Sequence, residues 1–282
     1  MKKLLYSILI ILIITLVVLL YSRFLGTKGL KVHEISLSCN IPVSYEGLKI
    51  IHFSDLHYRK VIREEQVENV IETINRTKPD IVLFTGDLLD EDYDIKNTDI
   101  NFLIEQLSKI ETKYGSYAIF GDHDNKFEEE IRNIYIQSNF TLLENNYTVV
   151  HNENNDKILI GGVGSSLNRK IDIDKILKEI TEEDKEIATQ IMLTHEPDTI
   201  PELLSKFPNT SIILAGHSIN GSINIPIIKK FLLPNGAKNY YEPYYQIDET
   251  TIYISNGIGV NQVNFRLLNT PSINFYRIKK SN

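Results

Sequence analysis

The sequence has little of several residue types on which whole classes of protein depend. Its 282 residues include one cysteine, two methionines and no tryptophan. A single cysteine excludes a disulfide framework and a zinc site built from thiolates. Acidic residues outnumber basic ones by 37 to 30, giving a formal charge of −7. This argues against a nucleic-acid partner, because such proteins displace counterions with basic surface. An anionic substrate would need another source of positive charge, for which a metal ion is the obvious candidate.

Alanine is absent before Ala118, and this absence bears on the apolar N-terminus. The run from Leu4 to Tyr21 is uncharged and broken only by Ser7 and Thr15, and a helix of this length nearly crosses a hydrocarbon core of about 30 Å. A cleaved secretory signal usually has a shorter apolar region and ends in small residues. A helix in the core of a soluble domain is the least favoured of the three alternatives, because this run is apolar on every face. An uncleaved anchor is therefore the better interpretation.

The charges around the apolar run do not settle its orientation, since basic residues stand on both sides: Lys2 and Lys3 before it, and Arg23, Lys28 and Lys31 after it. A very short tail before a single span most often stays inside the cell. We therefore expect a single-pass protein of the cell membrane, with residues 1–26 as anchor and short linker. Residues 27–282 are expected to form one monomeric domain on the extracytoplasmic side.

Past the anchor, the hydrophobic pattern alternates between strands and helices. Apolar runs of strand length stand at 49–54, 80–85, 116–120, 157–160, 190–194 and 211–215. Apolar residues recur at helical spacing within 67–74, 100–110, 173–180 and 200–207. From residue 240 onward the pattern changes to strands and turns. The alternation predicts an α/β protein with largely parallel central strands covered by helices.

Polar residues collect where these strands end. The segments read Ser54-Asp55-Leu56-His57, Gly86-Asp87, Gly121-Asp122-His123-Asp124, Thr194-His195-Glu196-Pro197-Asp198 and Gly216-His217-Ser218-Ile219-Asn220-Gly221. Open α/β sheets bind ligands at the carboxyl ends of their strands, and imidazole with carboxylate suits first-row divalent metals. Each segment alone is better explained as a turn or as a histidine bonded to backbone. Five of them on successive strands predict a metal site.

This ordered set of segments resembles the calcineurin-like metallophosphoesterases. The sequence looks most like their membrane-anchored bacterial branch, which acts on phosphodiester or pyrophosphate bonds, and the resemblance covers most of residues 45–278. It implies a four-layer α/β/β/α sandwich, in which two packed sheets are flanked by helices. It also implies a two-metal centre on the loops at the strand ends.

The resemblance implies a role for each matching residue. The metal ligands it implies are Asp55 and His57 for the first metal, Asp87 as the bridge, and Asp122, His195 and His217 for the second metal. His123 resembles the family's catalytic histidine, which helps to neutralise the phosphoryl group and protonates the leaving oxygen. Asp124 would orient His123.

Two residues of the metal shell depart from the family pattern. Asp122 stands where an asparagine usually ligates the second metal through its amide oxygen. Ile219 occupies the place of a histidine that ligates the first metal, and an isoleucine side chain cannot donate electrons to a cation. Ser222 also replaces the usual glutamine. We therefore expect one tightly bound divalent ion and a second, weaker one, with manganese, iron and zinc all suitable.

Two functions follow from the resemblance and its departures. The first is a metal-dependent phosphoester hydrolase that acts on a phosphodiester or pyrophosphate bond, using a metal-bound hydroxide and His123 as the general acid. The alternative is a catalytically impaired relative that binds metal or phosphate at the membrane surface. The expected substrates are a phosphorylated small molecule, a lipid head group or a wall polymer, and no nucleic acid.

Overall fold

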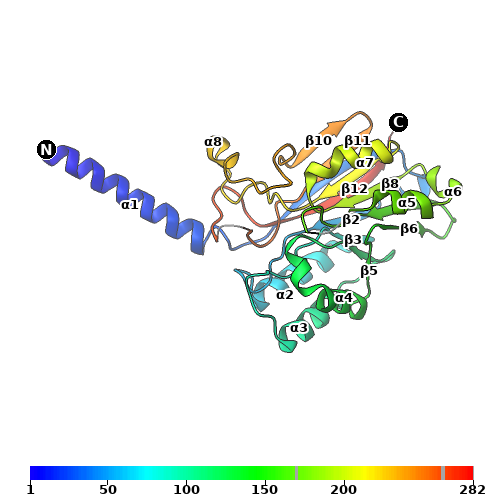
Figure 1. Cartoon of the computed structure of the whole chain (residues 1–282), viewed down its shortest axis with the longest axis horizontal. Helices are drawn as coiled ribbons and strands as arrows, with labels where there is room; N and C mark the ends of the chain where they lie inside the picture. Colours follow the sequence, from blue (N-terminus) through cyan, green and yellow to red (C-terminus); the bar gives the residue numbers. More distant parts are fainter. Residues whose placement is uncertain (169–170, 262–263, 282) are drawn as a thin grey trace.

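A computed structural model describes residues 1–168, 171–261 and 264–281 of the chain. Figure 1 labels its main elements. The helices are α1 (Lys2–Phe24), α2 (Glu64–Thr77), α3 (Asn97–Leu107), α4 (Glu128–Gln137), α5 (Ile173–Glu179), α6 (Glu182–Lys185), α7 (Ile200–Lys206) and α8 (Pro226–Lys229). The strands are β1 (Lys31–Cys39), β2 (Lys49–Phe53), β3 (Ile81–Phe84), β4 (Ser116–Ala118), β5 (Phe140–Leu142), β6 (Asn146–His151), β7 (Lys157–Gly162), β8 (Gln190–Thr194), β9 (Ile212–Ala215), β10 (Tyr244–Ile247), β11 (Thr250–Ile254) and β12 (Ser272–Lys280).

These strands form two six-stranded sheets. The first sheet has the order β1-β12-β2-β3-β4-β5, and the second has the order β10-β11-β9-β8-β7-β6. From β2 to β5 and from β7 through β9 to β11, neighbouring strands run parallel. The expected α/β fold with largely parallel central strands is confirmed.

The hydrophobic core has three parts, one between each pair of layers. Side chains such as Leu83 and Leu193 pack between the two sheets. Another cluster joins the first sheet to α2, α3 and α4, and a third joins the second sheet to α5 and α7. Figure 1 shows these helices on the outer sides of the two sheets. The sandwich therefore has four layers, and its inner strands are buried on both faces, which explains their continuous apolar sequences.

The periodic segments of the sequence become the helices of the outer layers. In α2, for example, Val67, Val70, Ile71 and Ile74 are buried against the first sheet, as their spacing predicts. The sequence analysis did not identify β1, β5 or β6. Strand β1 lies at the edge of its sheet and is largely exposed, and β5 has only three residues. Such strands lack the apolar run that identifies a buried strand.

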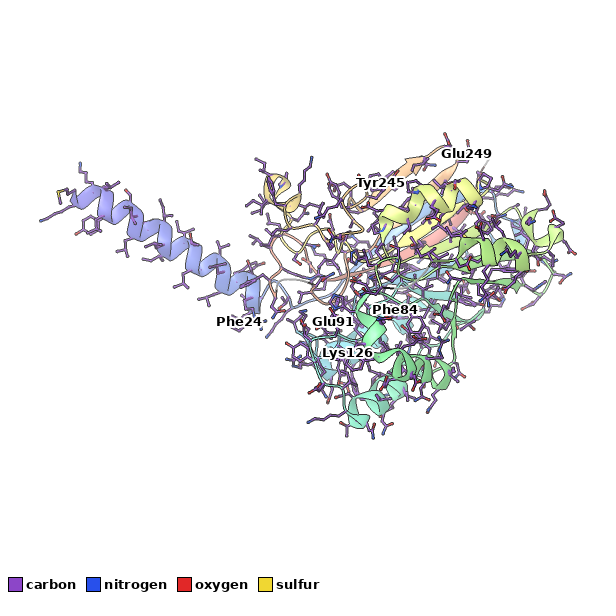
Figure 2. All side chains as sticks on the ribbon, in the orientation of Figure 1. Phe24, Phe84, Glu91, Lys126, Tyr245 and Glu249 are labelled. Atoms are coloured by element: carbon purple, nitrogen blue, oxygen red, sulfur yellow. The ribbon has the colours of Figure 1, made fainter. Side chains whose placement is uncertain are left out.

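Helix α1 extends away from the sandwich, as Figure 1 shows. It is long and apolar enough to cross a bilayer, and its most hydrophobic stretch has no part buried against the domain. In Figure 2 its side chains project on every side, with Phe24 at the junction with the domain. The apolar run of the sequence is therefore a candidate membrane span.

Candidate metal centre

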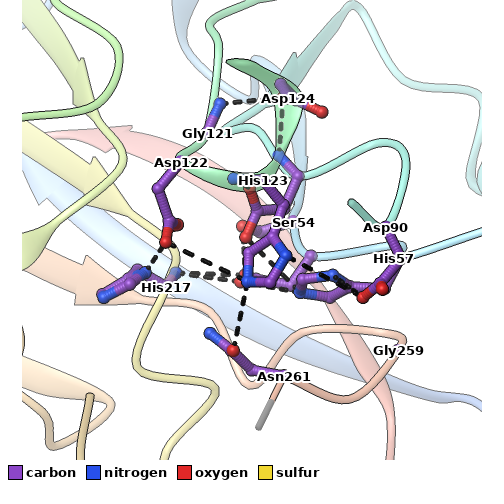
Figure 3. Close-up of polar contacts among 12 residues, drawn as sticks. Ser54, His57, Asp90, Gly121, Asp122, His123, Asp124, His217, Gly259 and Asn261 are labelled. Atoms are coloured by element: carbon purple, nitrogen blue, oxygen red, sulfur yellow. Dashed lines mark hydrogen bonds and ion pairs between the residues drawn. The ribbon is translucent and has the colours of Figure 1, made fainter. Parts of the chain in front are cut away.

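The polar segments of the sequence meet at one place between the two sheets. Strands β2, β3 and β4 of the first sheet deliver Asp55, Asp87 and Asp122, and strands β8 and β9 of the second sheet deliver His195 and His217. A hydrogen bond across the gap joins the His217 amide to Asp55 Oδ1, with N···O at 3.1 Å. The residues that the sequence places after separate strands are thus brought together, and Figure 3 shows part of this cluster.

The backbone is strained where these side chains enter the site. Asp55, His57, Asp87 and His217 have φ values between 44° and 62°, in the left-handed region that few residues other than glycine adopt. Each such residue costs of the order of 1–3 kcal/mol, and this strain concentrates at functional sites. Four of the six expected metal ligands are therefore held in conformations that the rest of the fold must enforce.

One group of possible ligand atoms comes from Asp87, Asp122, His195 and His217, and these atoms all lie within 4.8 Å of one another. Asp122 Oδ1 lies 3.0 Å from both His195 Nε2 and His217 Nδ1. Asp87 Oδ2 lies 3.2 Å from His195 Nε2. Two imidazoles and two carboxylates at this spacing suit a first-row divalent ion.

In each imidazole of this group, the nitrogen that points away from the carboxylates is hydrogen-bonded to a backbone carbonyl. His195 Nδ1 lies 2.6 Å from the Thr85 carbonyl oxygen, and His217 Nε2 lies 2.6 Å from the Asn235 carbonyl oxygen. A carbonyl only accepts, so each of these nitrogens carries the proton. The opposite nitrogen of each ring therefore faces the carboxylates and is the atom available to a metal, which is the arrangement that orients a histidine ligand.

A second group contains His57, His123 and the same Asp87. His57 Nε2 lies 3.4 Å from Asp87 Oδ2, and neither atom has a hydrogen-bond partner among the described residues. His57 Nδ1 faces Asp90 Oδ2 at 3.1 Å, which fixes its tautomer in the same way. Buried polar atoms without partners are rare in folded proteins, and a cation between them would satisfy both.

Asp55 adjoins this second group on the His57 side. Its Oδ1 atom lies 3.9 Å from His57 Nε2. The carboxylate is fully buried and accepts hydrogen bonds from the Ser54 hydroxyl and the His217 amide. Burial raises the pKa of Asp55, and the nearby Asp87 raises it further, although His195 and His57 oppose this shift. Asp55 is therefore positioned to complete a ligand set with His57 and Asp87.

The electrostatics of the site favour positive charge. Burial alone would raise the pKa of Asp122, but the hydrogen bonds with His195 and His217 hold it well below its usual range. Burial alone would lower the pKa of His195, but Asp87 and Asp122 raise it well above the ordinary value. These carboxylates therefore stabilise a compensating cation, and a divalent metal ion provides one.

His123 and Asp124 occupy different environments. The His123 ring stands edge-on to the His57 ring, with centroids 4.7 Å apart, and its Nε2 lies 3.3 Å from Asn261 Oδ1. The Asp124 carboxylate instead accepts hydrogen bonds from the amides of Gly121, Asp87 and Leu88. Among the described residues no hydrogen bond joins it to the His123 ring. Asp124 therefore ties two site loops together rather than orienting His123 directly as expected.

Ile219 lies beside Asp55, one of the ligands expected for the first metal. Its side chain is only 2% exposed, and a methyl group built on Gly257 would come within 2.5 Å of Ile219 Cγ2 and 3.1 Å of Asp55 Cβ. Ile219 also has a φ of 41°, which is unfavourable for a β-branched residue. An apolar side chain in a strained conformation thus stands next to Asp55.

The structure adds residues that the sequence analysis missed. Asp90 supports His57 and also contacts Lys60 Nζ at 3.0 Å. Burial raises the pKa of Asp90, but His57 and Lys60 lower it to about 2, so this carboxylate stays charged. A second aspartate three residues after Asp87 was the available signal. No sequence signal marks Asn261, since it stands alone in a loop.

The comparison with protein families identifies the family of the chain. The family model of the calcineurin-like phosphoesterases matches residues 48–221, more than half of the chain. The chain belongs to this family. Membership of this family supports phosphoester hydrolysis that depends on a divalent metal, and the cluster around Asp87 is a candidate site for the metal.

Relatives of known sequence extend over almost the whole chain. The metallophosphoesterase YkuE of Bacillus subtilis is 28% identical over 265 residues, which cover 93% of this chain and 90% of YkuE. A transmembrane protein with a metallophosphoesterase domain from Danio rerio is 24% identical over 289 residues, which cover 96% of this chain and 62% of that protein. The phosphoesterase family thus includes a relative that is named a transmembrane protein.

A solved structure shares the fold. The sulfate thiohydrolase SoxB of Thermus thermophilus superposes with a TM-score of 0.51 at 10% identity, over 78% of this chain and 53% of SoxB. At this identity the likeness concerns the two-sheet α/β architecture alone.

Proposed function

We propose that the protein hydrolyses phosphodiester or pyrophosphate bonds at a membrane surface, with two adjacent cation positions that share Asp87. One observation carries this proposal. Asp87 Oδ2 lies 3.4 Å from His57 Nε2 and 3.2 Å from His195 Nε2, so a single carboxylate faces both ligand groups. Bound divalent ions would supply the Lewis acidity that an anionic phosphoester requires in this acidic site.

The chain's own residues support the remaining chemistry. Asp55 and His57 hold one side of the site, and Asp122, His195 and His217 hold the other. His123 is about nine-tenths buried, and its Nε2–H can donate a hydrogen bond to the Asn261 side-chain oxygen. The same proton is available to a leaving oxygen that replaces this acceptor, which is the role of a general acid.

The alternative is a protein that binds metal or phosphate without turnover. The observation in its favour is Ile219, which places a buried apolar side chain next to Asp55, at the position where the resemblance implies a ligand. The site then has fewer donors on the His57 side than on the His195 side. Weak binding of the first ion would reduce or abolish hydrolysis.

Hydrolysis of bis-p-nitrophenyl phosphate separates these functions. The full chain in detergent should release nitrophenolate when Mn²⁺ is supplied and stop when a chelator is added. Asp87→Asn should lose both turnover and metal, whereas His151→Ala, at an exposed histidine outside the site, should match the parent. Metal binding without turnover would favour the alternative, and a protein that binds neither metal nor phosphate would exclude both.

We also propose that α1 anchors the protein in the cell membrane and places the domain outside the cytoplasm. This location supports three substrate classes, namely small phosphorylated molecules, lipid head groups and wall polymers. Protease treatment of intact cells from which the wall has been removed tests the orientation. The domain should be cut there, and a domain that is cut only after lysis would reverse the proposed topology.

A further inference from the structure

Helix α8 turns its apolar side chains outward and buries its lysine. Ile227 is 79% exposed, and Phe231 just beyond the helix is 82% exposed, whereas Lys229 is 2% exposed. On a protein surface in contact with water the opposite distribution is usual, because lysine is almost never buried unless it is paired. A cluster of exposed apolar side chains marks a surface that something apolar covers.

Polar contacts hold α8 in this orientation. Lys229 Nζ donates hydrogen bonds to Asn220 Oδ1 and, at 3.0 Å, to Glu242 Oε2. Just before the helix, the Asn224 amide donates to the Leu267 carbonyl at 2.9 Å. The lysine therefore fastens the inner face of α8 to the domain, and the isoleucines cannot turn inward without breaking this pairing.

Residues 266–268, which include the Leu267 that contacts Asn224, also contact the end of α1. The Arg266 amide donates to the Ser22 carbonyl at 3.0 Å, and a methyl group on Gly26 would lie 1.9 Å from the Arg266 carbonyl oxygen. The two backbones are thus in direct contact. Leu268 follows in the same loop and is 72% exposed. Residues 266–268 therefore connect the end of α1 to α8, and Figure 1 shows α8 on the side of the domain from which α1 departs.

The residues around the end of α1 and α8 have the mixed polar and apolar character expected at the boundary between lipid and water. A cavity of about 420 Å³ opens beside the end of α1, and Tyr21, Lys31, Asn224 and Arg266 are among its lining residues. Lys230, next to α8, is exposed. Basic and amide side chains beside exposed apolar ones suit phospholipid head groups above acyl chains.

We propose that Ile227, Ile228, Phe231 and Leu268 form a second membrane contact, which enters the bilayer that α1 spans. We name these four residues the interfacial surface. This proposal rests on the membrane anchor of the proposed function, and the occupant follows from the continuity of the interfacial surface with the end of α1. With two attachments, the domain has a fixed orientation toward the lipid.

The absence of tryptophan from the sequence makes a direct test possible. Single tryptophans are introduced by Phe231→Trp and, as a second probe of the same surface, Ile227→Trp. Ile136→Trp is the matched control, because Ile136 is a 67% exposed apolar residue of α4. Leu12→Trp reports on α1 itself. The full chains are reconstituted in vesicles of zwitterionic and anionic phospholipids, with or without bromine on the acyl chains.

The interfacial surface is supported if tryptophan at 231 or 227 emits at shorter wavelength than at 136 and loses at least half of its emission in brominated vesicles. Emission like that of the control, without quenching, would overturn it. Emission at short wavelength could also persist in brominated vesicles without quenching and shift to longer wavelength when the protein is diluted. This result would assign the surface to a second copy of the chain instead. Leu12→Trp is read separately: if it is not quenched, α1 does not span the bilayer and the anchor itself is wrong.

Discussion

Replacing Ile219 by histidine should restore a ligand to the His57 side of the metal centre. Ile219 is buried beside Asp55, close to the first-metal ligands. An imidazole is similar in size to the isoleucine side chain, so the variant needs little rearrangement. Its backbone φ of 41° suits histidine better than a β-branched residue. We therefore expect the free energy of unfolding of Ile219→His to stay within about 1 kcal/mol of the parent.

The size of the effect follows from the unequal ligand sets. In the proposed centre the His195 side has four protein ligands and the His57 side has three, with Asp87 counted in both. Even residues that only orient a metal ligand change affinity by about 10–100-fold, so an added ligand should strengthen the weak site at least that much. This corresponds to about 1.4–2.7 kcal/mol of binding free energy. The tight site should change little, because none of its ligands is altered.

Calorimetric titration of Mn²⁺ into the chelator-treated protein, with turnover of bis-p-nitrophenyl phosphate in the same samples, measures both effects. Ile219→Leu is the control, because it relieves the β-branched strain without adding a donor. The parent and Ile219→Leu should bind one ion tightly and a second weakly, whereas Ile219→His should bind two tightly and turn over faster. Two equally tight sites in the parent, or a single site in all three proteins, would refute this reasoning.

Three further predictions follow from the site. Alanine at His195 or His217 should weaken metal binding at least tenfold, whereas His123→Ala should retain metal and lose about 10²–10⁴ in rate; equal metal loss by all three in elemental analysis would contradict these roles. Mn²⁺ affinity should still be rising with pH above the ordinary imidazole pKa of about 6.5. Carboxylates raise the pKa of His57 and His195 against the effect of burial, and bound protons compete with the metal. An affinity that is constant above about pH 6.5 in a series of titrations would contradict this. Removal of residues 1–26 should leave a soluble domain whose melting temperature is within a few degrees of the full chain in detergent, since α1 is not buried against the domain; an insoluble or molten product would show that the domain does not fold alone.

The sequence was most informative where structure depends on local pattern. Apolar runs identified the buried strands, and helical spacing identified α2, α3, α5 and α7 of the outer layers but not α4. The polar segments after five strands indicated which side chains meet, because the carboxyl ends of parallel strands share one edge of a sheet. The exposed strand β1 and the short strand β5 carry no such pattern, since burial does not constrain their side chains.

Contacts within the site were harder to infer. Asp124 and His123 are neighbours in the sequence, yet the Asp124 carboxylate bonds to backbone amides. The support of His57 by Asp90 depends on the direction in which one imidazole points. Which partner a side chain contacts depends on differences of about an ångström in three-dimensional packing. The spacing of residues along the sequence does not determine these differences. The reversed orientation of α8 is also a property of packing, since it depends on what Lys229 contacts.

The order of strands in the first sheet has a consequence for how the protein is made. Strand β12, the last strand described along the chain, lies between β1 and β2, where it pairs parallel with β1 and antiparallel with β2. Until residue 280 has left the ribosome, β2 is an unpaired edge of the sheet formed by β2 to β5, and β1 has no neighbouring strand. The candidate membrane helix α1 is synthesised first, but the first sheet is completed only after β12 has been synthesised. A stop codon that removes even this one strand would therefore leave a tethered chain with an open sheet.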